Sequence, residues 1–264
     1  MTTILDFQKK KLANEKITMI TCYDYSFAQI IQQTSIDCVL VGDSLAQVMH
    51  GHNTTLKAST KMMALHTAAV VRGLPQKFVI TDMPFLSTRK GLRFAMDCVE
   101  LIMKSGAQAI KIEGADGHLE LIKHLVESGI PVMGHLGLTP QSIHQLGGPK
   151  VQGKKTEQAA KILKDSLALE KAGCFSLVLE CVPAALAAEI TQSLKIPTIG
   201  IGAGVETDGQ VLVLQDMLGM NPHFKPKFLK KYLNGFELMT GAINSYVTEV
   251  KSIKFPDHEH QYEN

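Results

Sequence analysis

The chain has 264 residues, of which 45% are hydrophobic and 20% are charged, and its formal net charge is +2. This length is enough for one sizeable core, and so small a net charge gives no argument for nucleic-acid or membrane binding. No stretch offers the ~18 consecutive apolar residues of a membrane span, and the N-terminus lacks the apolar run of a signal peptide. The five cysteines form no CxxC pair, which favours buried thiols. We expect a cytoplasmic protein.

Short apolar segments rich in Val and Ile recur along the chain. Eight of them are predicted strands: 17–24, 38–44, 77–85, 109–114, 131–137, 176–183, 197–204 and 210–219. Their length and composition suit strands that are buried on both faces, as parallel sheets require.

Segments with helical features separate these strands. Ser59 and Thr60 are possible N-caps, and Gly106 and Gly129 are plausible C-terminal stops. Strand followed by helix, eight times, predicts a (β/α)₈ TIM barrel. A doubly wound open sheet is the alternative, and periodicity alone does not separate the two. There are eight predicted strands, and the amino-acid composition does not change along the chain as it would between two domains. Both observations favour one barrel domain over residues 1–264, with a polar tail from about residue 255.

Polar side chains with acid–base chemistry stand near the ends of six predicted strands. They are Asp24, Asp43, Asp82, Glu113, His135 and Glu180. In a barrel the carboxyl ends of all strands meet at one rim, so these groups are expected to ring one pocket. Each acid taken alone could instead cap the following helix. More loop follows Asp43, Asp82 and Glu113, which argues against capping for these three.

A metal ion is the simplest shared partner for such carboxylates, because partly buried charges need one. Hard divalent ions such as Mg²⁺ prefer oxygen ligands, and no zinc motif competes for the site. We therefore predict that Asp43 and Asp82 bind Mg²⁺, with Glu113 near it, directly or through water.

Three further features remain open on sequence grounds. Alternation puts Lys111 on the same side of its strand as Glu113, where it would suit a substrate carboxylate; the alternative is an edge lysine reaching solvent. His135 is either a site residue or a structural histidine. The segment GIGAG, 200–204, either presents N–H groups to an anion or packs in a tight turn, and Val205 breaks the GxGxxG pattern.

Together these groups predict proton abstraction next to a carbonyl. A 2-oxo acid can chelate Mg²⁺, and the metal can stabilise the enolate. Glu180 can take the proton if burial raises its pKa. The enolate would then form a C–C bond, or the reverse reaction would cleave one.

The sequence resembles the ketopantoate hydroxymethyltransferase family over roughly residues 15 to 260. The matching segments occur in family order: TCYDYSFA (21–28), VGDSL (41–45), GHNTTL (51–56), HTAAVVRG (66–73), DMPF (82–85), KIEG (111–114), GHLGLTPQS (134–142), KVQG (150–153), LVLECVP (177–183), and IGIGAG with DGQVLV (199–213). Departures lie in LAQVMHGH, at Pro149 and in ADG (115–117), and none removes a residue to which we assign chemistry.

The resemblance implies a Mg²⁺ enzyme, typically a homodecamer, that uses 5,10-methylenetetrahydrofolate as co-substrate. Its substrate would be 3-methyl-2-oxobutanoate and its product 2-dehydropantoate, early in pantothenate synthesis. In the matching positions, Asp43, Asp82 and Glu113 would hold the metal. The 2-oxo acid would contact Asp43, Ser44, Asp82 and Lys111; Glu180 would accept the proton and His135 would line the site.

Two rival interpretations remain. One is a carbon–carbon or carbon–phosphorus bond enzyme of the phosphoenolpyruvate mutase and isocitrate lyase type, which would carry a cysteine in a polar loop near the metal. We find no such cysteine. The other is a non-catalytic barrel that binds a 2-oxo acid, for which loss of Asp43, Asp82 or Glu180 would be the signal; all three are present.

Overall fold

Eight parallel strands close into a barrel in the computed structural model, which describes residues 2–263. The strands pair in chain order, and β8 returns to pair with β1. Their bounds are β1 Ile17–Thr21, β2 Cys38–Val41, β3 Phe78–Asp82, β4 Ala109–Glu113, β5 Val132–Gly137, β6 Ser176–Glu180, β7 Thr198–Ile201 and β8 Gly209–Leu212. The prediction of a (β/α)₈ barrel is confirmed, and the open-sheet alternative is wrong.

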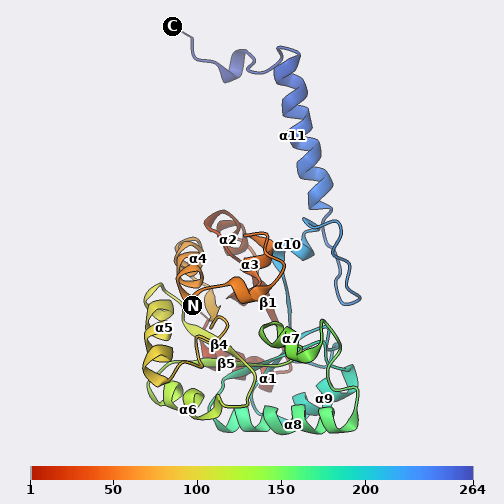
Figure 1. Ribbon diagram of the computed structural model, residues 1–264. Coiled ribbons are helices and arrows are strands. Elements are labelled where there is room, and N and C mark those ends of the chain that lie inside the picture. Colours follow the sequence, from red (N-terminus) through yellow and green to blue (C-terminus); the bar gives the residue numbers. More distant parts are fainter. Residues whose placement is uncertain (1, 264) are drawn as a thin grey trace. The chain divides into compact units, whose positions relative to one another are not determined.

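Helices surround the barrel (Figure 1). The longer ones in this part of the chain are α1 Ile4–Leu12, α2 Tyr25–Gln32, α4 Thr60–Gly73, α5 Leu92–Lys104, α6 Leu119–Glu127, α8 Thr156–Lys171 and α9 Ala184–Ser193. Short helical turns lie in the loops: α3 Leu45–Val48, η1 Thr55–Lys57, η2 Pro140–Ser142 and α7 Ile143–Leu146.

Local sequence signals set several helix ends. The Ser59 side chain accepts a hydrogen bond from the backbone N–H of Met62, as expected of an N-cap. Gly106 and Gly129 follow α5 and α6 with φ of 106° and 83°, a conformation that favours glycine. Asp24 also caps a helix, because its side chain accepts from the N–H of Phe27 in α2. For Asp24 the capping interpretation therefore holds.

The end of the predicted strand–helix alternation differs from expectation. Only residues 202–208 separate β7 from β8, which is too short for a helix that crosses back along the sheet. The eighth strand ends at Leu212, and part of the segment predicted as strand forms α10, Leu214–Met217, instead. An apolar run of this length fits a buried helix as well as a strand, so periodicity did not distinguish them.

Aromatic packing closes the end of the barrel where the strands begin. Phe7 of α1 makes edge-to-face contacts with Phe78, the first residue of β3, and with Phe175, which precedes β6. The ring centroids lie 5.6 and 5.3 Å apart, a favourable separation for aromatic pairs. Apolar side chains therefore fill this end, and the polar strand-end residues lie at the other.

The chain divides into two compact units, residues 1–213, which contain the whole barrel, and residues 214–264. The second unit contains α10, the 17-residue α11, Gly235–Lys251, and η3, His258–His260. The single-domain organisation stays a prediction. None of the helices described is both long and apolar enough to cross a membrane.

Candidate active site

Three carboxylates meet where β2, β3 and β4 end. Asp82 is the last residue of β3, Glu113 is the last of β4, and Asp43 lies two residues beyond β2. The backbone N–H of Asp43 donates to Asp82 Oδ2 at 3.0 Å. Asp43 and Asp82 are 4% and 3% exposed. The barrel thus brings together carboxylates separated by up to 70 positions in sequence, as the strand-end pattern predicted.

The pKa values of these carboxyl groups reflect their crowding. Burial, followed by the charges of Glu113 and Asp82, raises the pKa of Asp43 well above its usual range. Burial also raises the pKa of Asp82, although Lys111 opposes the shift. Burial acts on Glu113 too, but hydrogen bonding and charge from His135, with help from Lys111, lower its pKa. This concentration of negative charge favours a bound cation.

Lys111 is the buried cation at the centre of the cluster. It is 4% exposed, and its Nζ lies 2.9 Å from Asp82 Oδ1. Burial lowers its pKa, but the charges of Asp82, Glu113 and Asp43 outweigh burial and raise it. Lys111 is paired beside Asp82 on the neighbouring strand, so the edge-lysine interpretation is wrong.

His135 lies between two carboxylates and belongs to the site. Its Nδ1 is 3.4 Å from Glu113 Oε1 and its Nε2 is 3.3 Å from Glu180 Oε2. Burial and Lys111 lower the pKa of His135, but the interactions with Glu113 and Glu180 outweigh them and raise it to about 9. His135 therefore connects the ends of β4, β5 and β6, and its Nδ1 also lies 3.2 Å from the Nζ of Lys111.

Glu180 is the most accessible carboxylate of the group. Its side chain is 18% exposed, against 5% for Glu113 and 4% for Asp82. The next residue, Cys181, has a φ of 49° and a backbone N–H bonded to Ile201. This left-handed turn ends β6 immediately after Glu180, which holds the carboxylate at the rim.

The sequence interpretation missed Gln141 of η2. Its side-chain amide donates to Asp43 Oδ2 and to the backbone oxygen of Met83, both at 2.9 Å, and its backbone N–H donates to Glu113 Oε2 at 3.0 Å. One residue thus connects the ends of β2, β3 and β4. Gln141 stands inside the segment GHLGLTPQS, but an uncharged side chain gave no reason to single it out.

Tyr23 was also missed. It is fully buried, and its hydroxyl lies 2.7 Å from the Oγ of Ser44, next to Asp43. Burial raises the pKa of this phenol, so it stays protonated and available as a hydrogen-bond donor. Tyr23 therefore orients the Ser44 hydroxyl.

The donor set fits a hard divalent cation held by carboxylates. Asp82 Oδ1 is buried and contacts the Nζ of Lys111 at 2.9 Å, which leaves one of its two lone pairs available to a cation. Across residues 2–263, no three or more His, Cys, Asp or Glu side chains form a group spaced to hold an ion. Asp43, Asp82 and Glu113 are the carboxylates that could hold such an ion, and Gln141 contacts two of them.

The glycines in segment 200–204 allow neighbouring residues to pack close to the backbone. A Cβ on Gly204 would lie 2.6 Å from that of Ala184 at the start of α9, and a Cβ on Gly200 would lie 2.6 Å from Thr207 Oγ1. These contacts support the tight-turn interpretation of GIGAG.

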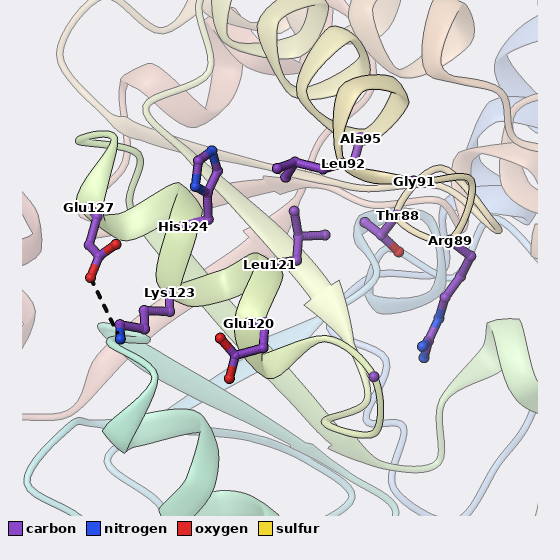
Figure 2. Close-up of a pocket in the computed structure, with 11 residues that line it drawn as sticks. Thr88, Arg89, Gly91, Leu92, Ala95, Glu120, Leu121, Lys123, His124 and Glu127 are labelled. Carbon is purple, nitrogen blue, oxygen red and sulfur yellow. Dashed lines mark ion pairs between the residues drawn. The ribbon is translucent and has the colours of Figure 1, made fainter.

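A cavity of about 590 Å³ lies apart from this cluster, between α5 and α6. Figure 2 shows Leu92, Leu121 and His124 among its lining residues, with Lys123 paired to Glu127. Because none of the strand-end carboxylates lines it, we do not assign the chemistry to this cavity.

Solved structures define the class of fold. Phosphonopyruvate hydrolase in a complex with oxalate and Mg²⁺ aligns with a TM-score of 0.64 at 9% identity, covering 98% of this chain and 93% of that one. A 2,3-dimethylmalate lyase of the PEP mutase/isocitrate lyase superfamily aligns with a TM-score of 0.59 at 14% identity, covering 97% and 89%. At such identities the likeness shows a shared α/β-barrel fold alone.

Sequence comparison then gives the family. The model described as ketopantoate hydroxymethyltransferase matches residues 1–258. Relatives named 3-methyl-2-oxobutanoate hydroxymethyltransferase are 63% identical in Bdellovibrio bacteriovorus, over 99% of this chain and 100% of the relative, and 60% identical in Coxiella burnetii, over 95% of each. The chain belongs to the ketopantoate hydroxymethyltransferase family. It is a transferase that acts at the first step of pantothenate biosynthesis. Neither of the two rival interpretations therefore holds.

Proposed function

We propose that the cluster at the ends of β2 to β6 removes the C3 proton of 3-methyl-2-oxobutanoate. C3 then bonds to the methylene carbon of 5,10-methylenetetrahydrofolate, and water supplies the hydroxyl oxygen, giving 2-dehydropantoate and tetrahydrofolate. The observation that carries this proposal is the convergence of four carboxylates, one lysine and one histidine from five consecutive strands, with Glu180 the most accessible carboxylate.

The 2-oxo acid presents a carboxylate beside a keto oxygen, and the site offers matching donors. The Nζ of Lys111 supplies positive charge in a buried setting, where an ionic hydrogen bond is strong. The Ser44 hydroxyl, held by Tyr23, supplies a neutral donor at the end of β2. These two groups are suited to orient the acid so that C3 faces Glu180.

Asp43 and Asp82 would hold a divalent cation, which we propose is Mg²⁺, with Glu113 beside it directly or through water. Bound there, the cation would supply positive charge for the keto oxygen as negative charge develops on it. Gln141 keeps two of these carboxylates in place, because it donates to both Asp43 and Glu113.

Glu180 is the proposed proton acceptor. His135 Nε2 lies 3.3 Å from Glu180 Oε2, a distance at which a protonated imidazole attracts the carboxylate. The raised pKa of His135 keeps that proton in place near neutral pH. A fixed carboxylate at the rim can accept a proton from C3 without first reorganising.

We also propose self-association into a homodecamer and a cytoplasmic location. Within residues 214–264, α11 buries only Gly235, while apolar side chains including Ile243 and Leu238 stay exposed at 63% and 59%. A second copy of the chain would cover such a helix. The described cysteines are all free, which suits a reducing compartment.

The test is NMR of 3-methyl-2-oxobutanoate in D₂O with the purified protein and no folate. We expect the C3–H signal to disappear when Mg²⁺ is present and to persist when EDTA removes it. A control adds a non-reactive folate analogue. If C3–H exchange appears only with the analogue present, folate binding is needed to assemble the site. Persistence of C3–H with both Mg²⁺ and the analogue would refute the proposal.

A further inference from the structure

Two histidines outside the carboxylate cluster point their Nε2 atoms at each other. His50 lies just after α3, in the segment that leads from β2 to α4, and His66 lies within α4. The two Nε2 atoms are 2.9 Å apart, and the rings are nearly perpendicular at 87°. The chemistry proposed above uses neither side chain.

The backbone determines which nitrogen of His66 carries hydrogen. Its Nδ1 lies 2.5 Å from the carbonyl oxygen of Tyr23, and only an N–H group can approach an acceptor so closely. In the neutral ring, Nε2 is then the nitrogen with a free lone pair, and His50 must donate to it. A histidine whose Nδ1–H is held by a backbone carbonyl is oriented as metal-ligating histidines usually are.

We propose that Nε2 of His50 and Nε2 of His66 form a binding site for a divalent transition ion of the Cu²⁺, Ni²⁺ and Zn²⁺ group. Imidazole nitrogens suit these ions, whereas Mg²⁺ prefers oxygen. The ion would replace the hydrogen bond between the rings. His50 would move its proton from Nε2 to Nδ1 through solvent, so that neither ring changes charge.

Two cis bonds to such an ion keep the nitrogens about as far apart as the hydrogen bond does, once the His50 ring turns off the axis that joins them. Two metal–nitrogen bonds of about 2.0–2.1 Å at a right angle put the nitrogens about 2.9 Å apart, which is the cis arrangement of a tetragonal Cu²⁺ or Ni²⁺ site. A tetrahedral Zn²⁺ site needs roughly 3.3 Å. His50 is exposed, so its ring can turn to direct the lone pair, while Tyr23 holds His66 in place.

Water would complete the coordination, because the structure brings no third His, Cys, Asp or Glu to the pair in the part of the chain it describes. An ion bound by only two protein ligands would therefore exchange readily with ions in solution. Occupancy would connect the segment after Ser44 to α4, and His66 already contacts Tyr23, whose hydroxyl orients Ser44. A bound ion would thus restrain one wall of the 2-oxo acid pocket from outside.

The experiment is calorimetric titration of the full-length protein with Ni²⁺ in the presence of excess Mg²⁺, which occupies the oxygen site. We expect His50→Gln and His66→Gln each to weaken the tightest Ni²⁺ binding by at least about tenfold, since each removes one of two ligands. His52→Gln is the matched control, an exposed histidine two positions from His50, and should bind as the unmodified protein does.

Pulsed EPR with Cu²⁺ provides a second readout. The unmodified protein should show two imidazole couplings, and His50→Gln should show one. Because His66→Gln also removes the bond to Tyr23, His50→Gln is the decisive variant, with circular dichroism to verify its fold. Unchanged Ni²⁺ affinity in His50→Gln, or an equal loss in His52→Gln, would overturn the site. Mg²⁺-dependent C3–H exchange should continue in His50→Gln, so this test and that of the proposed reaction can fail separately.

Discussion

The side-chain amide of Gln141 donates a hydrogen bond to Asp43 Oδ2 at 2.9 Å, while its backbone N–H donates to Glu113 Oε2 at 3.0 Å. A residue from the segment after β5 thereby orients carboxylates at the ends of β2 and β4. Without it, two buried carboxylates that repel each other would each lose a donor.

Replacement of Gln141 by Leu should therefore lower both Mg²⁺ affinity and kcat/KM. Loss of a residue that orients metal ligands typically costs about 10- to 100-fold. The measurements are Mg²⁺ titration and steady-state kinetics, with Gln192→Leu on the exposed face of α9 as the matched control. Equal behaviour of the two variants would show that Asp43 and Glu113 need no positioning by Gln141.

Glu180→Gln should keep 2-oxo acid binding and lose C3–H exchange, because the amide has nearly the same shape and cannot accept the proton. Loss of a general base usually lowers the rate by about 10²- to 10⁴-fold. Exchange in D₂O measures the rate, and calorimetry measures binding. Glu189→Gln, exposed on α9, is the control. Normal exchange in Glu180→Gln would assign the base elsewhere.

Lys111→Met should raise the KM for the 2-oxo acid and destabilise the fold. Removing one partner of a buried ion pair leaves Asp82 uncompensated, at a cost of about 3–5 kcal/mol. Adding Asp82→Asn should restore much of the stability but not the activity. Urea unfolding, followed by circular dichroism, measures the free energy of unfolding of both variants. A change confined to the folate KM would place Lys111 against the other substrate.

Asp216 of α10 should make stability depend on pH. Burial raises its pKa from 3.8 to about 6, with Lys231 opposing the shift. The folded state therefore holds this proton more tightly than the unfolded state, and stability falls as pH rises from about 4 to 6. Asp216→Asn should remove that fall and be more stable at pH 7 by about 1–2 kcal/mol, after allowance for solvent screening.

The measurement for Asp216 is the thermal midpoint of both proteins from pH 4 to pH 8. The two curves should meet at pH 4, separate as the pH rises to about 6, and stay apart above it. If they stay parallel over the whole range, the carboxyl group of Asp216 has an ordinary pKa in the folded protein.

Ile243→Lys should weaken self-association, because it puts a charge on the apolar surface of α11 that we propose a second copy covers. Sedimentation velocity should show smaller species than for the unmodified protein. Asn244→Lys adds the same charge one position away and is the control. An unchanged size distribution in Ile243→Lys would exclude this part of α11 from the contact.

The sequence by itself determined the architecture and the acid–base residues. Short runs of Val and Ile suit strands that are buried on both faces, as in a closed parallel sheet. Because a charged residue follows such runs, the carboxylates at the strand ends could be identified: Asp43, Asp82, Glu113 and Glu180. The motifs that contain them were enough to indicate the family. Local signals also gave the Ser59 cap and the glycine stops, because these depend only on neighbouring residues.

The tertiary structure alone decided what each group contacts. Gln141 and Tyr23 act through hydrogen bonds to strands distant in the sequence, and an uncharged side chain carries no sign of such partners. The burial of Lys111 and the place of His135 between Glu113 and Glu180 follow from the register of β4, β5 and β6. Register is set by packing over the whole barrel, so no local pattern could have supplied these contacts or the pairing of His50 with His66.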